Sequence, residues 1–120
     1  MSEAHDLARR AVACKGWRWM PGMRAVSPSS KHWRVWSDTR SVYEPEGCMD
    51  STPAEWSKDV PDLTDPATLG CLLALVRDAY GKPLSFCRYV EGNPPFWHIN
   101  TGHTGATEAE ALVAALEAAP

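Results

Sequence analysis

The chain has 120 residues, a length at which one domain buries a single core. Hydrophobic residues make up 44% and charged residues 22% of the sequence, a composition that excludes wholesale disorder and is typical of a globular protein. No apolar run is longer than that of Cys71 to Val76, which is too short to cross a bilayer, and residues 1–16 lack the apolar stretch of a signal peptide. We therefore expect a cytoplasmic protein with no membrane partner.

The formal net charge of −3 hides an uneven distribution of charged residues. Residues 9–40 hold eight basic residues and one acid, a net charge of +7, whereas residues 44–65 hold seven acids and one lysine, a net charge of −6. Two interpretations are open. Either the basic segment forms a face for an anionic ligand, or the two segments lie against each other and neutralise each other.

The first expected element is a helix over residues 3–15, where apolar residues recur at helical spacing, with Ser2 as N-cap and Gly16 as the stop. Residues 17–20 and 33–36 are rich in strand-forming residues, and the turn-forming sequence SPSSK lies between them. They predict a first hairpin, which a strand at residues 41–43 would extend.

The next segment, residues 44–63, is acidic, rich in proline and poor in periodicity. This pattern predicts a long loop, with room for one helical turn at residues 53–58. The clearest helix of the chain follows it. Asp65 is the expected N-cap, Pro66 suits the first helical position, and Gly81 ends the apolar stripe.

Residues 84–90 and 96–100 flank the turn sequence EGNPP and predict a second hairpin. Alternation places two sets of side chains on opposite faces of its first strand: Leu84, Phe86, Arg88 and Val90 on one, and Ser85, Cys87 and Tyr89 on the other. A final helix is expected to begin at a capping box formed by Thr107 and Glu110. The predicted fold is therefore a small single α+β domain, an antiparallel β-sheet of two hairpins with about three helices packed on one face.

Three blocks of sequence stand in this order in the chain: RRAVACKGWRWMPGMRAV, PDLTDPATLGCLLALVRDAYG and GATEAEALVAALEAA. With these blocks the chain resembles a family of small proteins of tailed bacteriophages and prophages. The resemblance implies a bacteriophage origin and action in the host bacterial cytoplasm, and it assigns no activity to any residue. By analogy with other small bacteriophage proteins, it suggests an accessory factor that counters bacterial defence.

The sequence contains no convincing catalytic or metal-binding motif. His98 and His103 lack a partner Cys or carboxylate at metal-ligand spacing, and the four widely spaced cysteines are expected to be free thiols. Cys48 is the one cysteine in the predicted loop, but a nucleophile would also need a positioned base. We expect no catalytic residue, no metal site and no cofactor.

Two candidate binding regions remain. The loop NTGHTGAT leads into the N-terminus of the last helix, where Thr104 and Thr107 could help to hold a phosphate; the plain alternative is a strand-to-helix connection capped by Thr107. The second region combines stacking and cationic side chains that could grip a base and its phosphate. Its residues are Trp17, Arg18, Trp19, Arg24, Trp33, Arg34 and Trp36.

Several of the six tryptophans must instead be core in a domain of this size, and Trp97 and one of Trp17 or Trp19 are the expected core residues. The leading hypothesis is a non-enzymatic accessory protein that sequesters a small anionic ligand, such as a nucleotide or cyclic oligonucleotide; a homodimer would complete its pocket. The alternative is an interaction module that masks a host defence protein through exposed Trp and Arg side chains. Nucleic-acid binding is the weakest hypothesis, because the net charge is negative and no recognised motif is present.

Overall fold

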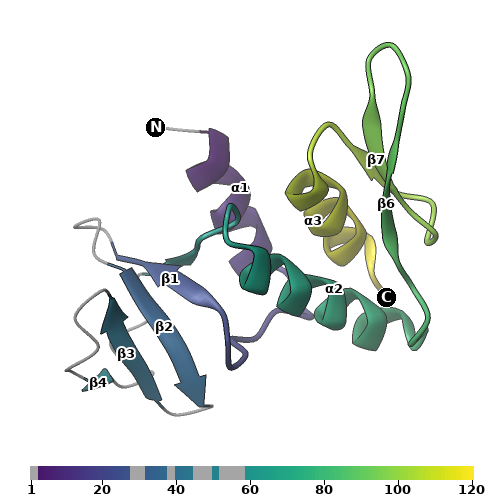
Figure 1. Ribbon diagram of the computed structural model, residues 1–120. Coiled ribbons are helices and arrows are strands. Elements are labelled where there is room, and N and C mark those ends of the chain that lie inside the picture. The colour runs from purple at the N-terminus through teal and green to yellow at the C-terminus, as the bar shows by residue number, and fades with distance from the viewer. Residues whose placement is uncertain (1–2, 28–31, 38–39, 45–49, 52–58) are drawn as a thin grey trace.

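The computed structural model describes residues 3–27, 32–37, 40–44, 50–51 and 59–120 (Figure 1). Its helices are α1 (Glu3–Val12), α2 (Pro66–Tyr80) and α3 (Glu108–Ala118). Its strands are β1 (Arg24–Val26), β2 (His32–Ser37), β3 (Arg40–Glu44), β4 (Asp50–Ser51), β5 (Val60–Pro61), β6 (Cys87–Val90), β7 (Phe96–Ile99) and β8 (Thr104–Gly105).

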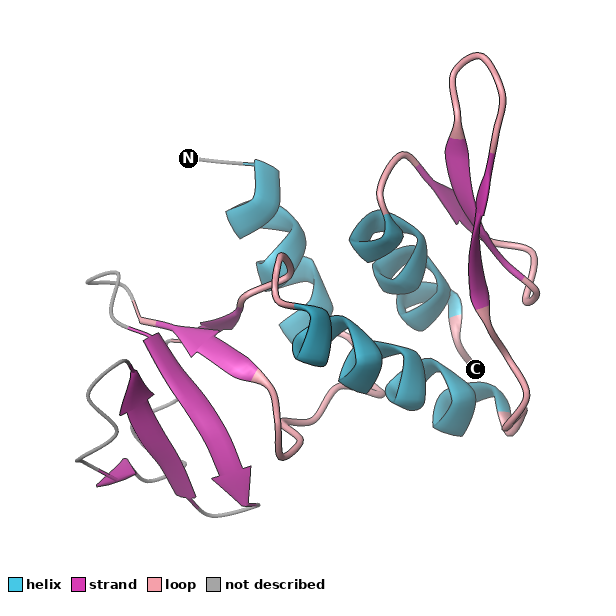
Figure 2. Ribbon diagram, viewed as in Figure 1, coloured by secondary structure: helices cyan, strands magenta, loops and turns pink. Residues whose placement is uncertain are grey.

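The strands form two antiparallel sheets, one of five strands in the order β4-β3-β2-β1-β5 and one of three in the order β6-β7-β8. The helices lie between the sheets, with α3 against the second sheet and α1 and α2 against α3 (Figure 2). The predicted α+β class is confirmed, but the strands form two sheets in place of one, and the first sheet pairs residues 24–26, not the predicted residues 17–20, with β2. The separation of the sheets follows from α2, whose 15 residues carry the chain about 22 Å before the second hairpin begins.

The helix α2 begins and ends where the sequence predicted. The side chain of Asp65 accepts a hydrogen bond from the backbone N–H of Thr68, and Pro66 occupies the first helical position, where no backbone donor is needed. Gly81 ends the helix with φ = 62°, a left-handed conformation that glycine adopts without a steric penalty. Both ends are therefore specified by local sequence.

The helix α1 ends at Val12, before the stop predicted at Gly16. Two tight turns follow it, in which Cys14 N–H donates to the carbonyl of Ala11 and Trp17 N–H donates to the carbonyl of Cys14. A Cβ at Gly16 would lie 3.2 Å from a methyl group of Leu116 in α3. Gly16 thus allows the chain to pass close to α3, and the predicted N-cap Ser2 lies outside the described residues.

The prediction of a strand at residues 17–20 is wrong, because β1 begins at Arg24, after a turn around Gly22 with φ = 99°. The tryptophans of this segment mark burial instead. Trp17 and Trp19 pack partly against the core and meet edge to face, with ring centroids 5.4 Å apart. Large aromatic residues occur wherever much apolar surface is buried, so they do not by themselves specify a strand. The strands predicted at residues 33–36 and 41–43 are confirmed as β2 and β3.

The segment predicted as a long acidic loop contributes two short strands to the first sheet. Asp50–Ser51 pairs with β3, and Val60–Pro61 pairs with β1 at the opposite end of the sheet. Residues 45–49 and 52–58, which include the predicted helical turn, lie outside the described residues. The edge position suits Pro61, which has no N–H to donate to a further strand.

The second sheet contains the predicted hairpin as β6 and β7, and β8 adds a third strand. The strand β8 passes very close to α3: a Cβ at Gly105 would lie 2.5 Å from the backbone nitrogen of Ala111. Only glycine can occupy this position without moving backbone.

One cluster of buried residues joins the three helices to both sheets. Its centre lies between α2 and α3, whose facing side chains are fully buried: Leu72, Leu75, Val76, Leu112 and Val113. Val35 of β2 and Ile99 of β7 extend the cluster into the first and second sheets. The relative placement of the sheets is thus fixed by helices that both of them contact.

Candidate functional site

The first region to consider is the basic face predicted for an anionic ligand. Arg24 and Arg34 lie directly opposite each other on β1 and β2. Like charges in such a cross-strand pair repel. Each guanidinium is compensated by an aspartate of the acidic segment: Arg24 Nη1 lies 3.2 Å from Asp62 Oδ2, and Arg34 Nη1 lies 2.8 Å from Asp65 Oδ2.

Arg34 connects the first sheet to the N-terminus of α2. Its Nη2 lies 3.3 Å from the second oxygen of Asp65, and its Nη1 also donates to the carbonyl of Gly22. Burial alone would raise the pKa of Asp65, but hydrogen bonds from Arg34 and Thr68 outweigh it and hold the pKa below its ordinary value. The pair therefore has a structural role at the cap of the helix.

Arg18 is the third arginine of the predicted site. It is exposed, and its Nη2 lies 2.7 Å from Asp78 Oδ2 near the end of α2. Each of the three arginines predicted to meet phosphates therefore has a carboxylate partner within the chain. For Arg24 and Arg34, these contacts correspond to the second interpretation of the charge distribution, in which basic and acidic segments neutralise each other.

The predicted stacking tryptophans are not gathered on one described surface. Trp97 packs partly buried against the core, and so do both Trp17 and Trp19, of which the sequence predicted one. Trp33 is half-buried on β2, opposite Ala25 of β1. The side chain of Trp36 lies outside the described part of the chain.

The second predicted region, the loop before α3, is closed by its own hydrogen bonds. Thr107 Oγ1 accepts from the N–H of Glu110, so Thr107 caps the helix as predicted. The carboxylate of Glu110 accepts from the N–H of Ala106, one residue before the N–H that a capping box would use. Glu108 and Glu110 place two carboxylates in the first turn, where the helix dipole would otherwise favour a bound anion. Thr104 is exposed on β8, opposite His98. This arrangement does not favour phosphate.

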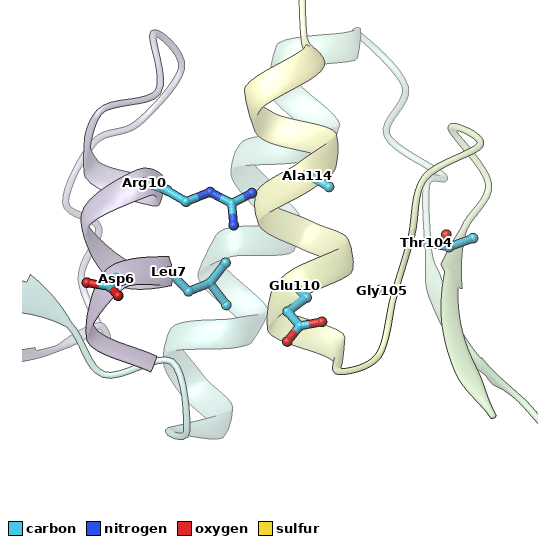
Figure 3. A pocket seen from close by; sticks show the side chains of 7 residues that line it. All are labelled: Asp6, Leu7, Arg10, Thr104, Gly105, Glu110 and Ala114. Atoms are coloured by element: carbon cyan, nitrogen blue, oxygen red, sulfur yellow. The ribbon is translucent and has the colours of Figure 1, made fainter. Parts of the chain in front are cut away.

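A cavity of about 470 Å³ lies beside α1, α3 and β8, and Thr104 forms part of its wall (Figure 3). Arg10 points from α1 toward α3 in this cavity, and it is held by Glu117 through contacts of 2.6 Å and 3.1 Å. Asp6 and Glu110 place two carboxylates in the lining, and the charge of Arg10 is already neutralised by Glu117. The cavity therefore has an excess of negative charge and would repel the anionic ligand predicted from the sequence.

The described residues offer little reactive chemistry. No group of three or more His, Cys, Asp or Glu among them could hold a metal ion. Cys14, Cys71 and Cys87 are free thiols whose pKa is raised by burial, that of Cys87 to about 11. They are poor nucleophiles at neutral pH, and Cys48 lies outside the described residues.

The strongest candidate site is instead on the second sheet. Three large hydrophobic side chains are exposed in the described part of the chain, Leu84 by 84%, Phe86 by 46% and Tyr89 by 52%. All three lie on β6 or on the residues leading into it. Together with Arg88, which is exposed between the two aromatic residues in sequence, they form what we call the hairpin surface: Leu84, Phe86, Arg88 and Tyr89.

None of the described elements covers the outer face of β6, on which Phe86 and Arg88 stand. The hairpin of β6 and β7 projects beyond the helices, and α3 packs on one face of its sheet (Figure 1). Ser85 is buried and Cys87 is half-buried on that face, whereas Phe86 and Arg88 point to the other. Tyr89 lies on the same face as Cys87, where its ring centroid is 5.5 Å from that of Trp97, and its side chain is about half exposed.

The hairpin surface was not predicted from the sequence, although alternation separates the two faces of the strand correctly. The alternating pattern cannot show which face a helix covers, because both faces carry apolar side chains. Arg88 was the available signal: a charged residue between Phe86 and Val90 marks that face as the one in contact with water.

Comparisons with protein-family models, curated proteins and solved structures found no match to this chain. None of the helices in the described ranges is both long enough and apolar enough to span a bilayer.

Proposed function

We propose that this protein is a non-enzymatic interaction module that binds a partner protein through the hairpin surface. The observation that carries the proposal is the gathering of Leu84, Phe86 and Tyr89, the large exposed hydrophobic residues of the described chain, on one strand and its approach. Phe86 stands on one face of the strand and Tyr89 on the other, so the two side chains flank the same edge of the sheet, and exposed apolar side chains grouped in this way are typical of interaction sites. Aromatic residues beside an arginine also match the composition of binding hot spots.

The resemblance to bacteriophage proteins gives this proposal its biological setting. On that basis we expect the partner to be a bacterial host protein in the cytoplasm, and masking of a defence protein is the form of binding that we propose. The hydrophobic residues would lie at the centre of such an interface, and the polar residues of the hairpin turn would lie at its rim.

Capture of a small anionic ligand is the competing hypothesis. A nucleotide at Arg18, Arg24 and Arg34 would have to displace Asp78, Asp62 and Asp65 from their guanidinium groups. Displacing a carboxylate leaves it near the bound phosphate, and the two negative charges repel. The contacts within the chain therefore favour a protein partner over an anionic ligand, and the same argument applies to a nucleic-acid backbone.

The test is affinity capture from bacterial lysate with three forms of the purified protein. The first is the wild type, and the second carries Phe86→Ser and Tyr89→Ser. The third carries Arg9→Ser and Ala13→Ser, two exposed positions in or just after α1 that serve as the matched control. We expect a protein that the wild type and the control retain and that the hairpin variant loses, while circular dichroism shows that all three forms are folded.

A partner that the hairpin variant retains would contradict the proposal, and so would failure of the wild type to retain any protein above the level of blank resin. A parallel thermal-shift screen against mono-, di- and cyclic oligonucleotides addresses the competing hypothesis. A nucleotide that raises the melting temperature of the wild type and of the hairpin variant alike would favour ligand capture instead.

A further inference from the structure

The edge of the second sheet presents backbone hydrogen-bonding groups of β6 in addition to its side chains. β6 is an end strand of its sheet, and β7 is its one partner among the described strands. Just before β6, the carbonyl of Phe86 accepts a hydrogen bond from the backbone N–H of Asn100, and the N–H of Phe86 donates to the side chain of Asn100. Ile99, which is paired with Cys87, donates its N–H to the carbonyl of His103 on the opposite side of β7, so Phe86 and not Cys87 is joined to the neighbouring strand by hydrogen bonds. In an antiparallel ladder hydrogen-bonded and non-hydrogen-bonded pairs alternate, which turns the backbone groups of Arg88 and Val90 toward β7. The N–H and C=O groups of Cys87 and Tyr89 therefore point to the open edge.

An open edge of this kind can accept an extended peptide as an additional strand. Residues opposite Cys87 and Tyr89 would then form hydrogen-bonded pairs with β6. If the peptide runs antiparallel to β6, residues opposite Phe86, Arg88 and Val90 would form non-hydrogen-bonded pairs, in which the facing side chains come closest. The outer face of β6 therefore determines which peptide side chains fit.

That face presents an apolar residue, a cation and an apolar residue in turn. Arg88 is exposed and, within the described ranges, makes no ion pair, in contrast to Arg18, Arg24 and Arg34. A carboxylate opposite Arg88 would supply the missing charge, and apolar side chains opposite Phe86 and Val90 would bury their surface. The complementary peptide has an acidic residue with an apolar residue two positions away on each side.

A second copy of this chain is a poor occupant of the same edge. If two copies of β6 paired antiparallel and used all the free groups of Cys87 and Tyr89, Cys87 of each copy would face Tyr89 of the other. The two Arg88 residues would then face each other in a non-hydrogen-bonded pair, in which side chains lie closest together. Like charges in that position repel, so Arg88 opposes self-pairing and favours an acidic partner.

We propose that the hairpin surface accepts an extended segment of a partner protein as a fourth strand beside β6, with an acidic residue opposite Arg88 and apolar residues opposite Phe86 and Val90. This inference rests on the proposed function and names the chemistry of the partner. Backbone hydrogen bonds to Cys87 and Tyr89 supply affinity, and the three side chains of the outer face supply specificity.

The test uses a yeast-displayed library of random peptides about ten residues long, enough to span β6 with flanking residues, selected on the intact protein. We expect enriched peptides to share the pattern apolar-x-acidic-x-apolar. A representative peptide should bind Arg88→Glu about tenfold more weakly than wild type, and replacing its acidic residue by lysine should restore binding to that variant. Arg88→Gln, the second variant, should lose less affinity for the peptide than Arg88→Glu. Arg9→Glu on α1 is the matched control and should bind the peptide as well as the wild type does.

Different failures have different meanings. Enriched peptides that lack the pattern, or that bind Arg88→Glu as well as wild type, would overturn the strand-addition proposal. If their binding still requires Phe86 and Tyr89, the proposed function stands; if it does not, both fail. Light scattering tests whether a second copy occupies the edge: a wild-type dimer that dissociates when Phe86→Ser and Tyr89→Ser are introduced would overturn the proposal. A library from which no peptide is enriched would overturn it as well.

Discussion

The link between Arg34 and Asp65 leads to a prediction about stability that also bears on function. If Arg34 were held ready for a ligand, its removal would change binding and leave the fold intact. The structure instead makes it a structural residue, because the side chains of Arg34 and Asp65 are only 32% and 12% exposed and joined by two hydrogen bonds. Removing either partner should therefore destabilise the protein.

The magnitude follows from the contacts of Asp65. Loss of the N-cap costs about 1 kcal/mol, and a partly buried arginine left without its carboxylate costs about 2 kcal/mol. Asp65→Ala should therefore lower the free energy of unfolding by about 3 kcal/mol, and Asp65→Ser, which keeps a capping oxygen, by about 2 kcal/mol. Arg34→Met should cost about 2 kcal/mol for the same reason.

The assay is urea unfolding followed by tryptophan emission, arranged as a double-mutant cycle of Arg34→Met and Asp65→Ser. Because the two changes remove the same interaction, we expect a coupling free energy of about 1.5 kcal/mol. The exposed pair of Arg18 and Asp78 is the matched control and should show a coupling within the error of additivity. A coupling between Arg34 and Asp65 below about 0.5 kcal/mol would refute the reasoning.

Three further predictions concern stability and reactivity. Burial opposes ionisation of Asp65, but hydrogen bonds from Arg34 and Thr68 outweigh it and lower its pKa, and Arg10 lowers the pKa of Glu117. The contribution of both carboxylates to stability is therefore full above their unfolded pKa values and is lost as the pH falls through the folded ones. Urea midpoints should therefore decline on acidification, less steeply in Asp65→Ser, and equal slopes would contradict this. Cys87, with its pKa raised by burial to about 11, should be about 0.1% thiolate at pH 8; its alkylation, followed by mass spectrometry, should speed up sharply on unfolding. Gly105→Ala should lower the free energy of unfolding by at least about 2 kcal/mol, because the added Cβ would collide with the backbone of α3. Gly70→Ala, at an open helical position, should raise it by about 0.5 to 1 kcal/mol. If thermal unfolding shows no loss of stability in Gly105→Ala, β8 can move away from α3.

The elements that the sequence predicted well are those with local signals. The helix α2 has its cap at Asp65 and its stop at Gly81, and neither signal depends on what the helix later contacts. The faces of β6 follow from alternation alone. By contrast, the two-residue strand at Val60–Pro61 has no periodicity, and only its pairing with β1 makes it a strand.

The candidate site was harder to predict because it depends on partners distant in the sequence. The sequence shows that Arg24 and Arg34 are basic, but not that each meets an aspartate more than thirty residues away. Exposure of Phe86 likewise depends on where α3 packs. Sequence patterns gave the composition of both surfaces, and tertiary contacts decided which of them remains available for binding.

The packing of α1 on α3 has a consequence for synthesis on the ribosome. The apolar side of α1 belongs to the same buried cluster as α3, and Arg10 closes the contact through Glu117. The two helices are about a hundred residues apart in the sequence. At roughly 5 to 20 residues per second, α3 is therefore synthesised several seconds after Leu7 and Ala11 of α1. During that time the nascent chain exposes an apolar helix face, which is a natural target for a chaperone, and the domain becomes resistant to proteolysis only after α3 emerges.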